Sequence, residues 1–253
     1  MVQLAYTYEP TFSDKLSMLL DRVDYRLAEC QDDRDAIFRL RYEAYRREQA
    51  IDECSSEMFR DEYDEKGLVK LFGVYLDDRL VSSVRIHIAS PDRPYCPSLG
   101  PFQDVLEPEL EAGKVIVDST RFVTDKVASQ EHKGLPHLAL RLCWMAVTYF
   151  EADHFLAAVR AEHQAFYRRT FQHKVICPAR TYPLLAAPIC LMSVSHADAR
   201  RHLLRRNPFY RSSGFERRML FGTSPASLGA QERPQKHLRL VDTNQRMLLT
   251  AQT

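Results

Sequence analysis

The chain has 253 residues, of which 45% are hydrophobic and 27% charged, and its formal net charge is +1. This length and composition fit a globular protein with one large domain or two small ones, and they exclude a disordered or collagen-like chain. Glycine occurs only 8 times, and the sequence contains neither G-x-G-x-x-G nor a P-loop motif. Nucleotide sites built on glycine-rich loops are therefore excluded.

Targeting and metal-binding signals are also missing from the sequence. The longest apolar runs, such as 143–147 and 184–192, are far shorter than the roughly 18 residues that a membrane helix needs, and the N-terminus does not resemble a secretory signal. We expect a cytoplasmic protein without a transmembrane segment. The six cysteines form no C-x-x-C pair and the nine histidines lack metal-ligand spacing, so neither a metal site nor a disulfide framework is predicted.

The net charge is close to zero, but acidic and basic residues are concentrated in different parts of the chain. Residues 43–65 contain nine acidic and three basic side chains, whereas residues 200–218 contain seven arginines and one glutamate. Such a basic segment predicts an acidic protein, a phosphate-bearing ligand or nucleic acid as its partner. Nucleic acid is the weakest of the three, because the chain has no base-stacking module and is nearly neutral overall.

The first half of the chain predicts an N-terminal arm over residues 1–20 that ends in a short amphipathic segment. A strand follows over 25–30, and then a helix that Asp32 and Asp33 are expected to cap. Irregular acidic sequence leads to strands over 69–76 and 80–89, which flank a turn and indicate a hairpin. Four prolines between residues 90 and 101 predict a loop.

The second half alternates strands and helices. We expect a β-branched strand over 114–124, a buried apolar helix over 138–150, strands over 154–159, 174–177 and 189–195, and a short helix over 162–171. Residues 223–253 are polar and are predicted to form a flexible tail. Antiparallel strands followed by strand–helix–strand units indicate an α/β (α+β) fold with a mixed sheet, in a single domain over residues 1–222.

Charged residues interrupt the apolar elements at several points. They are Arg41, Asp61, Asp64, Arg85, Asp118 and Arg121. Opposite charges in the centre of a sheet are costly unless they are paired and hydrogen-bonded, so such a group predicts a functional site. In a strand, residues three apart face opposite sides unless a bulge intervenes, so Asp118 and Arg121 share a face only if this strand is bulged.

The order of these residues resembles the acyl-homoserine-lactone (autoinducer) synthases. The motifs are Arg41-x-x-x-Tyr45, Asp61-x-Tyr63-Asp64, Arg85 in a strand, Pro101-Phe102 and Asp118-Ser119-Thr120-Arg121-Phe122. Those enzymes carry R-x-x-x-F, D-x-[FY]-D, a strand arginine, a phenylalanine and E-x-S-R-F at similar separations. The run L-R-Y-E-A-Y-R looks still closer to the related N-acyl amino acid synthases, which share a GNAT-like acyltransferase fold. The resemblance covers roughly residues 25–180.

Two departures from the autoinducer synthases favour a different amine acceptor. Asp118 stands where those enzymes have glutamate, and no tryptophan follows Tyr45. The resemblance therefore implies transfer of a fatty acyl chain from acyl carrier protein to the α-amine of an amino acid. An autoinducer synthase that uses S-adenosylmethionine, and a non-catalytic binding module on the same fold, remain the alternatives.

The resemblance also implies a GNAT-like mixed, mostly antiparallel sheet flanked by helices. Its fourth strand, 114–124, is expected to be bulged and to splay from the fifth, 154–159, so that the acyl thioester enters between them. In acetyl-CoA users the loop at 130–135 is a glycine-rich pyrophosphate cradle, but here it keeps only Gly134. This suits acyl-phosphopantetheine on a carrier protein as co-substrate, with acyl-CoA as the other donor and no permanently bound cofactor.

Roles for individual residues follow from this resemblance. Asp118 is the first choice as general base, with Asp61 or Asp64 as the second choice. Arg121 and Arg85 are expected either to bind the acceptor carboxylate or to brace the acidic loop through paired hydrogen bonds. A backbone N–H between Ser119 and Phe122 is expected to meet the oxyanion. The substrate-binding candidates are Arg41, Tyr45, Arg85, Phe102, Ser119, Phe122, Trp144 and Phe155, of which Phe102, Phe122, Trp144 and Phe155 are expected to wall the acyl pocket. The candidate contacts for the carrier protein are Arg168, Arg169, Lys174, Arg205 and Arg206.

Overall fold

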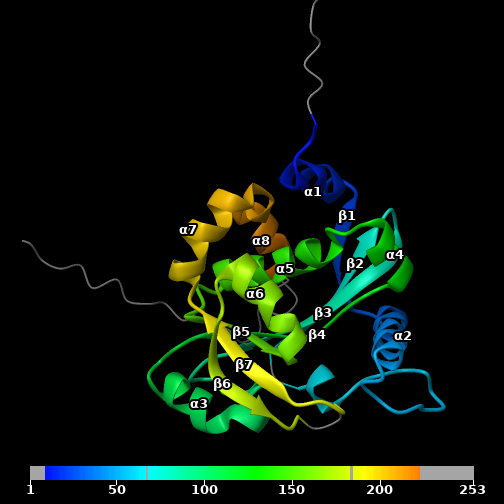
Figure 1. Ribbon diagram of the computed structural model, residues 1–253. Helices are drawn as coiled ribbons and strands as arrows, with labels where there is room; N and C mark the ends of the chain where they lie inside the picture. The colour runs from blue at the N-terminus through cyan, green and yellow to red at the C-terminus, as the bar shows by residue number, and fades with distance from the viewer. Residues whose placement is uncertain (1–8, 67, 183–184, 223–253) are drawn as a thin grey trace, which may run out of the picture. The chain divides into compact units, whose positions relative to one another are not determined.

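The computed structural model describes residues 9–66, 68–182 and 185–222 (Figure 1). Within them, seven strands form one sheet in the order β1-β2-β3-β4-β5-β7-β6. All neighbouring strands are antiparallel except β4 and β5, which are parallel. The strands are β1 (Val23–Leu27), β2 (Val69–Leu76), β3 (Arg79–Ala89), β4 (Ile116–Thr124), β5 (His154–Val159), β6 (Lys174–Arg180) and β7 (Ile189–Val194). This mixed, mostly antiparallel sheet confirms the predicted fold class.

Helices cover both faces of the sheet (Figure 1). One face carries the long apolar α5 (Leu135–Tyr149), packed on β3 and β4, together with α8 (Gly214–Phe221), which packs on α5 and β1. The other face carries α2 (Gln31–Arg47) against β2, β3 and β4, and α3 (Leu99–Glu111) against β6. The remaining helices are α1 (Phe12–Leu20), α4 (Lys126–Glu131), α6 (Gln164–Phe171) and α7 (His196–Arg206), with short 3-10 turns η1 (Glu62–Asp64), η2 (Ala161–His163) and η3 (Pro208–Tyr210).

Alternating side chains divide the core between the two faces. On β2, Phe72 joins the cluster under α5 and α8, whereas its neighbour Leu71 packs with Ile37 and Phe38 of α2. Helix α5 is buried nearly all round because it is apolar nearly all round, as predicted from its sequence. In the part of the chain that the structure describes, no helix is long and apolar enough to cross a membrane.

Strands β4 and β5 pair only at their beginnings. Ile116 to Ser119 lie opposite His154 to Ala157, and the two strands separate beyond that point. The register between β3 and β4 also shifts, because Arg85 lies opposite Thr120 while Ser83 lies opposite Val123. Two steps along β3 therefore match three along β4, which is a β-bulge. Both the bulge and the splay of the fourth and fifth strands are confirmed.

Three predictions about local structure need correction. Helix α2 begins at Gln31 with Cys30 as its N-cap, so Asp32 and Asp33 lie in the first turn, where their charges favour the helix dipole but do not cap it. The predicted loop over 90–101 ends at Ser98, and α3 begins at Leu99. The helix tolerates Pro101 because this residue lies in the first turn, where a missing N–H costs little.

No helix was predicted for the basic segment. It contains α7, whose N-cap Ser195 accepts a hydrogen bond from the Asp198 backbone N–H, and α8. The predicted strand over 189–195 accordingly ends at Val194. The predicted tail over 223–253, and residues 1–8 of the arm, lie outside the described residues.

Candidate active site

A cavity of about 380 Å³ lies where β4 and β5 separate. Residues of the β4 bulge, the end of β5, helix α6 and the end of α2 line it. Most of the lining is apolar or aromatic, and it includes Ala44, Tyr45, Ala50, Phe122, Val123, Pro136, Ala158, Val159, Phe166, Tyr167, Leu185 and Ile189. A long hydrocarbon chain therefore finds a compatible environment here. We call this cavity the cleft.

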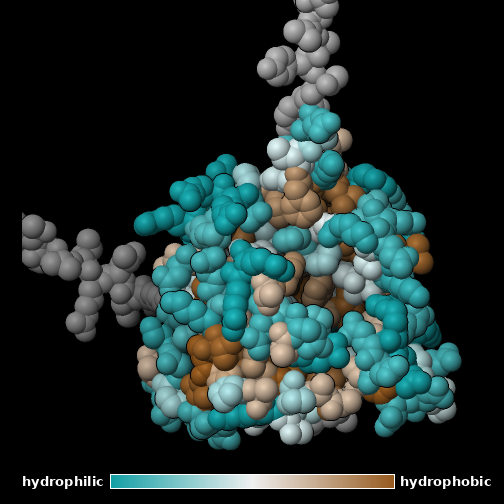
Figure 2. Space-filling view, viewed as in Figure 1, coloured by the Kyte–Doolittle hydropathy of each residue, from teal (hydrophilic) through white to brown (hydrophobic). Residues whose placement is uncertain are grey.

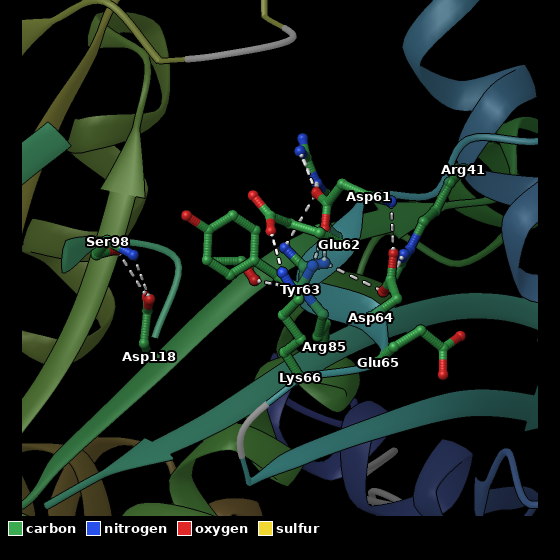
Figure 3. A network of polar contacts seen from close by, with 12 residues as sticks. Arg41, Asp61, Glu62, Tyr63, Asp64, Glu65, Lys66, Arg85, Ser98 and Asp118 are labelled. Carbon is green, nitrogen blue, oxygen red and sulfur yellow. Dashed lines mark hydrogen bonds and ion pairs between the residues drawn. The ribbon is translucent and has the colours of Figure 1, made fainter. Parts of the chain in front are cut away.

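A buried network of five charged side chains reaches the cleft through Arg121, and Figure 3 labels the other four, Arg41, Asp61, Asp64 and Arg85. Arg41 donates to Asp64 at 2.8 Å, and the Arg85 Nη1 atom lies 3.1 Å from the same carboxylate. Arg85 also donates to Asp61, which accepts two further hydrogen bonds from Arg121 at 2.6 and 3.1 Å. Side-chain exposure does not exceed 4% for any of the five. Such charges are tolerated inside a protein because each carboxylate has arginine partners.

The two carboxylates also organise the acidic loop. Asp61 is the N-cap of η1 and accepts from the Tyr63 N–H at 3.0 Å, while the Asp61 N–H donates to Asp64 at 3.0 Å. Burial alone would raise the pKa of Asp61, but the hydrogen bonds and charges of Arg85 and Arg121 outweigh it and hold this pKa at about 2. The pKa of Asp64 is likewise lowered by its arginine neighbours, Arg41 first, against the effect of burial. Carboxylates held so firmly in the charged form are weak bases.

Arg121 occupies the bulge itself. Its φ of 53° lies in the left-handed region, which is uncommon for a residue with a Cβ atom. Its guanidinium lies over the rings of Tyr45, Phe59 and Tyr182 at 5.6, 4.7 and 5.6 Å. The extra residue of the bulge places Arg121 on the same face of the sheet as Asp118, which a regular strand would not do.

Asp118 is not among the residues that line the cleft. It is fully buried and accepts two hydrogen bonds at 2.9 Å from Ser98, one from the backbone N–H and one from the hydroxyl. Figure 3 shows this pair apart from the arginine network. Burial raises the pKa of Asp118, even though the bonds from Ser98 oppose it. Both carboxylate oxygens are thus engaged by the loop that leads into α3.

The structure separates the four aromatic residues expected to wall an acyl pocket. Phe122 lines the cleft, together with Tyr45 and Ser119. Phe102, Trp144 and Phe155 are instead at most 2% exposed and fill the core, and Trp144 packs against His196 with 5.1 Å between ring centroids. The sequence pattern identified these three as large and apolar, but it did not show that neighbouring side chains fill the space around them.

Several polar residues of the cleft were not among the candidates, and three of them, Glu48, Arg160 and His163, lie together. Arg160 donates to Glu48 at 2.6 Å, and its Nη2 atom lies 3.3 Å from Nε2 of His163. All three line the cleft. The available signal was position, because Arg160 directly follows strand β5 and His163 lies in the next turn, η2, and polar residues at a strand end often belong to sites.

The candidate carrier-protein contacts lie on neighbouring elements. Arg168 and Arg169 are exposed on α6, Lys174 begins β6, and Arg205 and Arg206 are exposed at the end of α7. Helices α6 and α7 pack together, and the Nε2 atom of Gln172, the C-cap of α6, lies 3.3 Å from the Nε2 atom of His202 on α7. Figure 2 shows hydrophilic side chains over both helices. Helix α6 also supplies Phe166 and Tyr167 to the lining of the cleft.

Comparisons with known proteins agree with this architecture. The family model described as N-acyl amino acid synthase FeeM matches residues 36–195. The structure of FeeM, an N-acyl amino acid synthase from uncultured soil microbes, has a TM-score of 0.60 at 18% identity, covering 74% of this chain and 98% of that one. The structure of TofI in a ternary complex with an inhibitor and MTA has a TM-score of 0.51 at 11% identity, and the match covers 72% of this chain and 96% of TofI. At these identities the likeness shows a shared fold. No curated protein sequence matches the chain.

Proposed function

Because the chain belongs to the FeeM family of N-acyl amino acid synthases and is therefore an acyltransferase, we propose that it moves a fatty acyl chain from acyl carrier protein to the α-amine of an amino acid. The observation that carries this proposal is the apolar cleft between the splayed strands β4 and β5. A carrier-protein donor places the reaction in the cytoplasm.

The thioester carbonyl lies at the bulge of β4 in this proposal. The register between β3 and β4 passes over Arg121 and Phe122, so the backbone there is not used in the regular ladder. A bulge N–H directed into the cleft then stabilises the oxyanion that forms when the amine attacks. The acyl chain occupies the apolar lining, whose walls include Ala158 and Ile189.

The acceptor must lose a proton before it attacks, because an ammonium group is not a nucleophile. We propose His163 as the general base, since an imidazole suits proton transfer near neutral pH and His163 lines the cleft. Arg160, beside it, is placed to hold the acceptor carboxylate together with Arg47, another lining residue. Asp118 is then a positioning residue that fixes the loop at Ser98.

The arginine network supports this chemistry without taking part in it. Asp61 anchors the side chain of Arg121, and the backbone of Arg121 forms the bulge. The network therefore holds the proposed oxyanion site in a conformation that an isolated strand would not adopt. This favours bracing of the acidic loop as the role of Arg85 and Arg121.

An assay with purified protein, acyl carrier protein charged with dodecanoate, and each amino acid in turn tests the proposal. Mass spectrometry should detect an N-dodecanoyl amino acid with at least one acceptor. Release of methylthioadenosine from S-adenosylmethionine would instead assign an autoinducer synthase. Failure of every donor and acceptor to react would favour the non-catalytic binding module.

A further inference from the structure

One nitrogen atom of Arg160, Nη2, lies between two acceptors of the cleft. It donates to the Oε2 atom of Glu48 at 2.6 Å, and it is 3.3 Å from the Nε2 atom of His163. All three residues belong to the lining of the cleft. A cationic N–H group therefore lies between a carboxylate oxygen and an imidazole nitrogen, at a place that a substrate in the cleft can reach.

The contact between Arg160 and His163 has only one possible direction. A guanidinium has donors but no acceptor and keeps its charge, so the Nε2 atom of His163 must accept. In the neutral imidazole the proton is then on Nδ1, and the lone pair of Nε2 is directed toward the cation. Of the two groups beside Nη2, one thus supplies a negative charge and the other a basic lone pair.

Glu48 is an unfavourable residue for its position in the helix. It is the C-cap of α2, and the C-terminal end of a helix carries a partial negative charge, which favours cations such as Arg46 and Arg47 of the last turn. The ion pair of Glu48 with Arg160 joins two partly exposed side chains, and such pairs add little to stability. The fold gains little from this carboxylate, which favours a role in binding.

The ammonium group of an amino acid has the same chemistry as this nitrogen. Both are cationic N–H donors that need a carboxylate for their charge and further acceptors for their other N–H bonds. An ammonium in the place of Nη2 would also direct a proton at Nε2 of His163, as the proposed general base requires. The carboxylate of an α-amino acid is attached to the same carbon as the nitrogen, so the displaced guanidinium can bind it without leaving the cleft.

A second carboxylate holds Arg160 from outside this site. The Nε atom of Arg160 lies 3.0 Å from the Oε1 atom of Glu162, which is exposed and is not among the residues that line the cleft. This contact is made by the nitrogen nearest the aliphatic part of the side chain, so it can persist while Nη2 moves away from Glu48. Arg160 then leaves the site with the loss of one ion pair, which the incoming ammonium replaces.

We infer that Glu48 and His163 form the subsite for the acceptor's ammonium group, and that Nη2 of Arg160 fills this subsite until the acceptor binds. This inference rests on the proposed function, because it takes the cleft as the site of acyl transfer. It names what the acceptor must carry, an ammonium and a carboxylate on one carbon. An amine without the carboxylate gives the displaced guanidinium no new partner, and a carboxylate without the amine leaves Arg160 in place.

Steady-state kinetics of two matched variants tests the inference. Glu48 and Glu162 both pair with Arg160, but only Glu48 lines the cleft. Glu48→Gln should raise the KM for the amino acid by about tenfold or more and leave the KM for the acyl donor within about twofold, because a charge-assisted hydrogen bond to the ammonium is lost. Glu162→Gln should change neither KM by more than about twofold. Equal KM values for the amino acid in the two variants would overturn the inference.

A measurement without turnover separates this inference from the proposed function. The nitrogen resonances of the His163 ring report its tautomer and hydrogen bonds, and the signal is assigned by its loss in His163→Gln. Glycine and acetate are the probes, because both carry a carboxylate and only glycine carries an ammonium. Glycine should shift the His163 signal in the wild type and not in Glu48→Gln, and acetate should shift it in neither.

Three results of this measurement would overturn the inference whether or not acyl transfer is found. They are no shift with glycine in the wild type, the same shift with glycine in Glu48→Gln, and equal shifts with glycine and acetate. A glycine shift that requires Glu48, combined with a lack of acyl transfer from every donor, would contradict only the proposed function.

Discussion

Arg121 donates two hydrogen bonds to Asp61, from Nε at 3.1 Å and from Nη2 at 2.6 Å, although 60 positions separate the two residues. Arg121 forms the bulge that lines the cleft, and Asp61 caps the acidic turn η1. This pair thus connects the conformation of β4 to a loop that precedes the sheet's central hairpin.

Replacing Asp61 with asparagine should destabilise the fold strongly. The variant Asp61→Asn leaves Arg85 and Arg121 buried beside a neutral group, and breaking a buried pair of this kind typically costs about 3 to 5 kcal/mol. Urea unfolding monitored by circular dichroism measures the change. Glu62→Gln is the control. Glu62 and its partner Lys66 are both exposed, so loss of this ion pair should leave the urea midpoint of unfolding unchanged. Equal midpoints for both variants would contradict a stabilising network.

The same carboxylate should make stability depend on acid pH. The folded-state pKa of Asp61 is about 2, below its ordinary value of 3.8, so its contribution is complete above pH 3.8 and is lost as the pH falls toward 2. Linkage makes this loss roughly 2 kcal/mol. Thermal unfolding of the wild type and of Asp61→Asn between pH 2 and 5 measures it. The variant should show a smaller slope in this range, and identical slopes would refute the assignment.

Two substitutions distinguish the possible general bases. His163→Gln should lower kcat by about a hundredfold, as loss of a general base does. Asp118→Asn should lower kcat less than tenfold, because both oxygens of the carboxylate are engaged by Ser98 and Asp118 does not line the cleft. The opposite pattern would restore Asp118 as the base that the sequence indicated.

A larger side chain at Ala158 should shorten the acyl chains that the enzyme accepts. Ala158 lines the cleft at the end of β5, and Ala158→Phe would fill part of its volume. We expect kcat/KM for a hexadecanoyl donor to fall at least tenfold more than that for a butanoyl donor. Competition between the two donors in one reaction, read by mass spectrometry, measures the ratio. A uniform loss for both lengths would place the acyl chain elsewhere.

Charge reversal on α7 should weaken transfer from carrier protein alone. Acyl carrier proteins are acidic, and attraction between exposed charges acts mainly on the encounter rate and is screened over about 8 Å at physiological salt. The double variant Arg205→Glu/Arg206→Glu should therefore lower kcat/KM for the carrier-bound donor about tenfold and reduce its dependence on salt. A short thioester mimic is the control and should react as with the wild type. Equal losses for both donors would assign these arginines to folding.

The sequence determined much of the framework through local patterns. Alternation and helical spacing correctly predicted the hairpin of β2 and β3, the buried helix α5 and the order of the later strands. The requirement that buried charges be paired also identified the members of the arginine network from the sequence alone. These conclusions depend on periodicity and desolvation, which act on each segment regardless of its neighbours.

Only the tertiary structure decided how those residues are used. Periodicity fixes the face of a strand on which a side chain lies, but the space beyond that face depends on elements distant in sequence. Asp118 thus meets Ser98 and not the cleft, and Phe102, Trp144 and Phe155 meet filled core. Glu48, which no local pattern distinguished, and His163 line one cavity at the place where β4 and β5 separate. That separation is a property of the assembled sheet, where the bulge and the pairing of distant strands set the geometry.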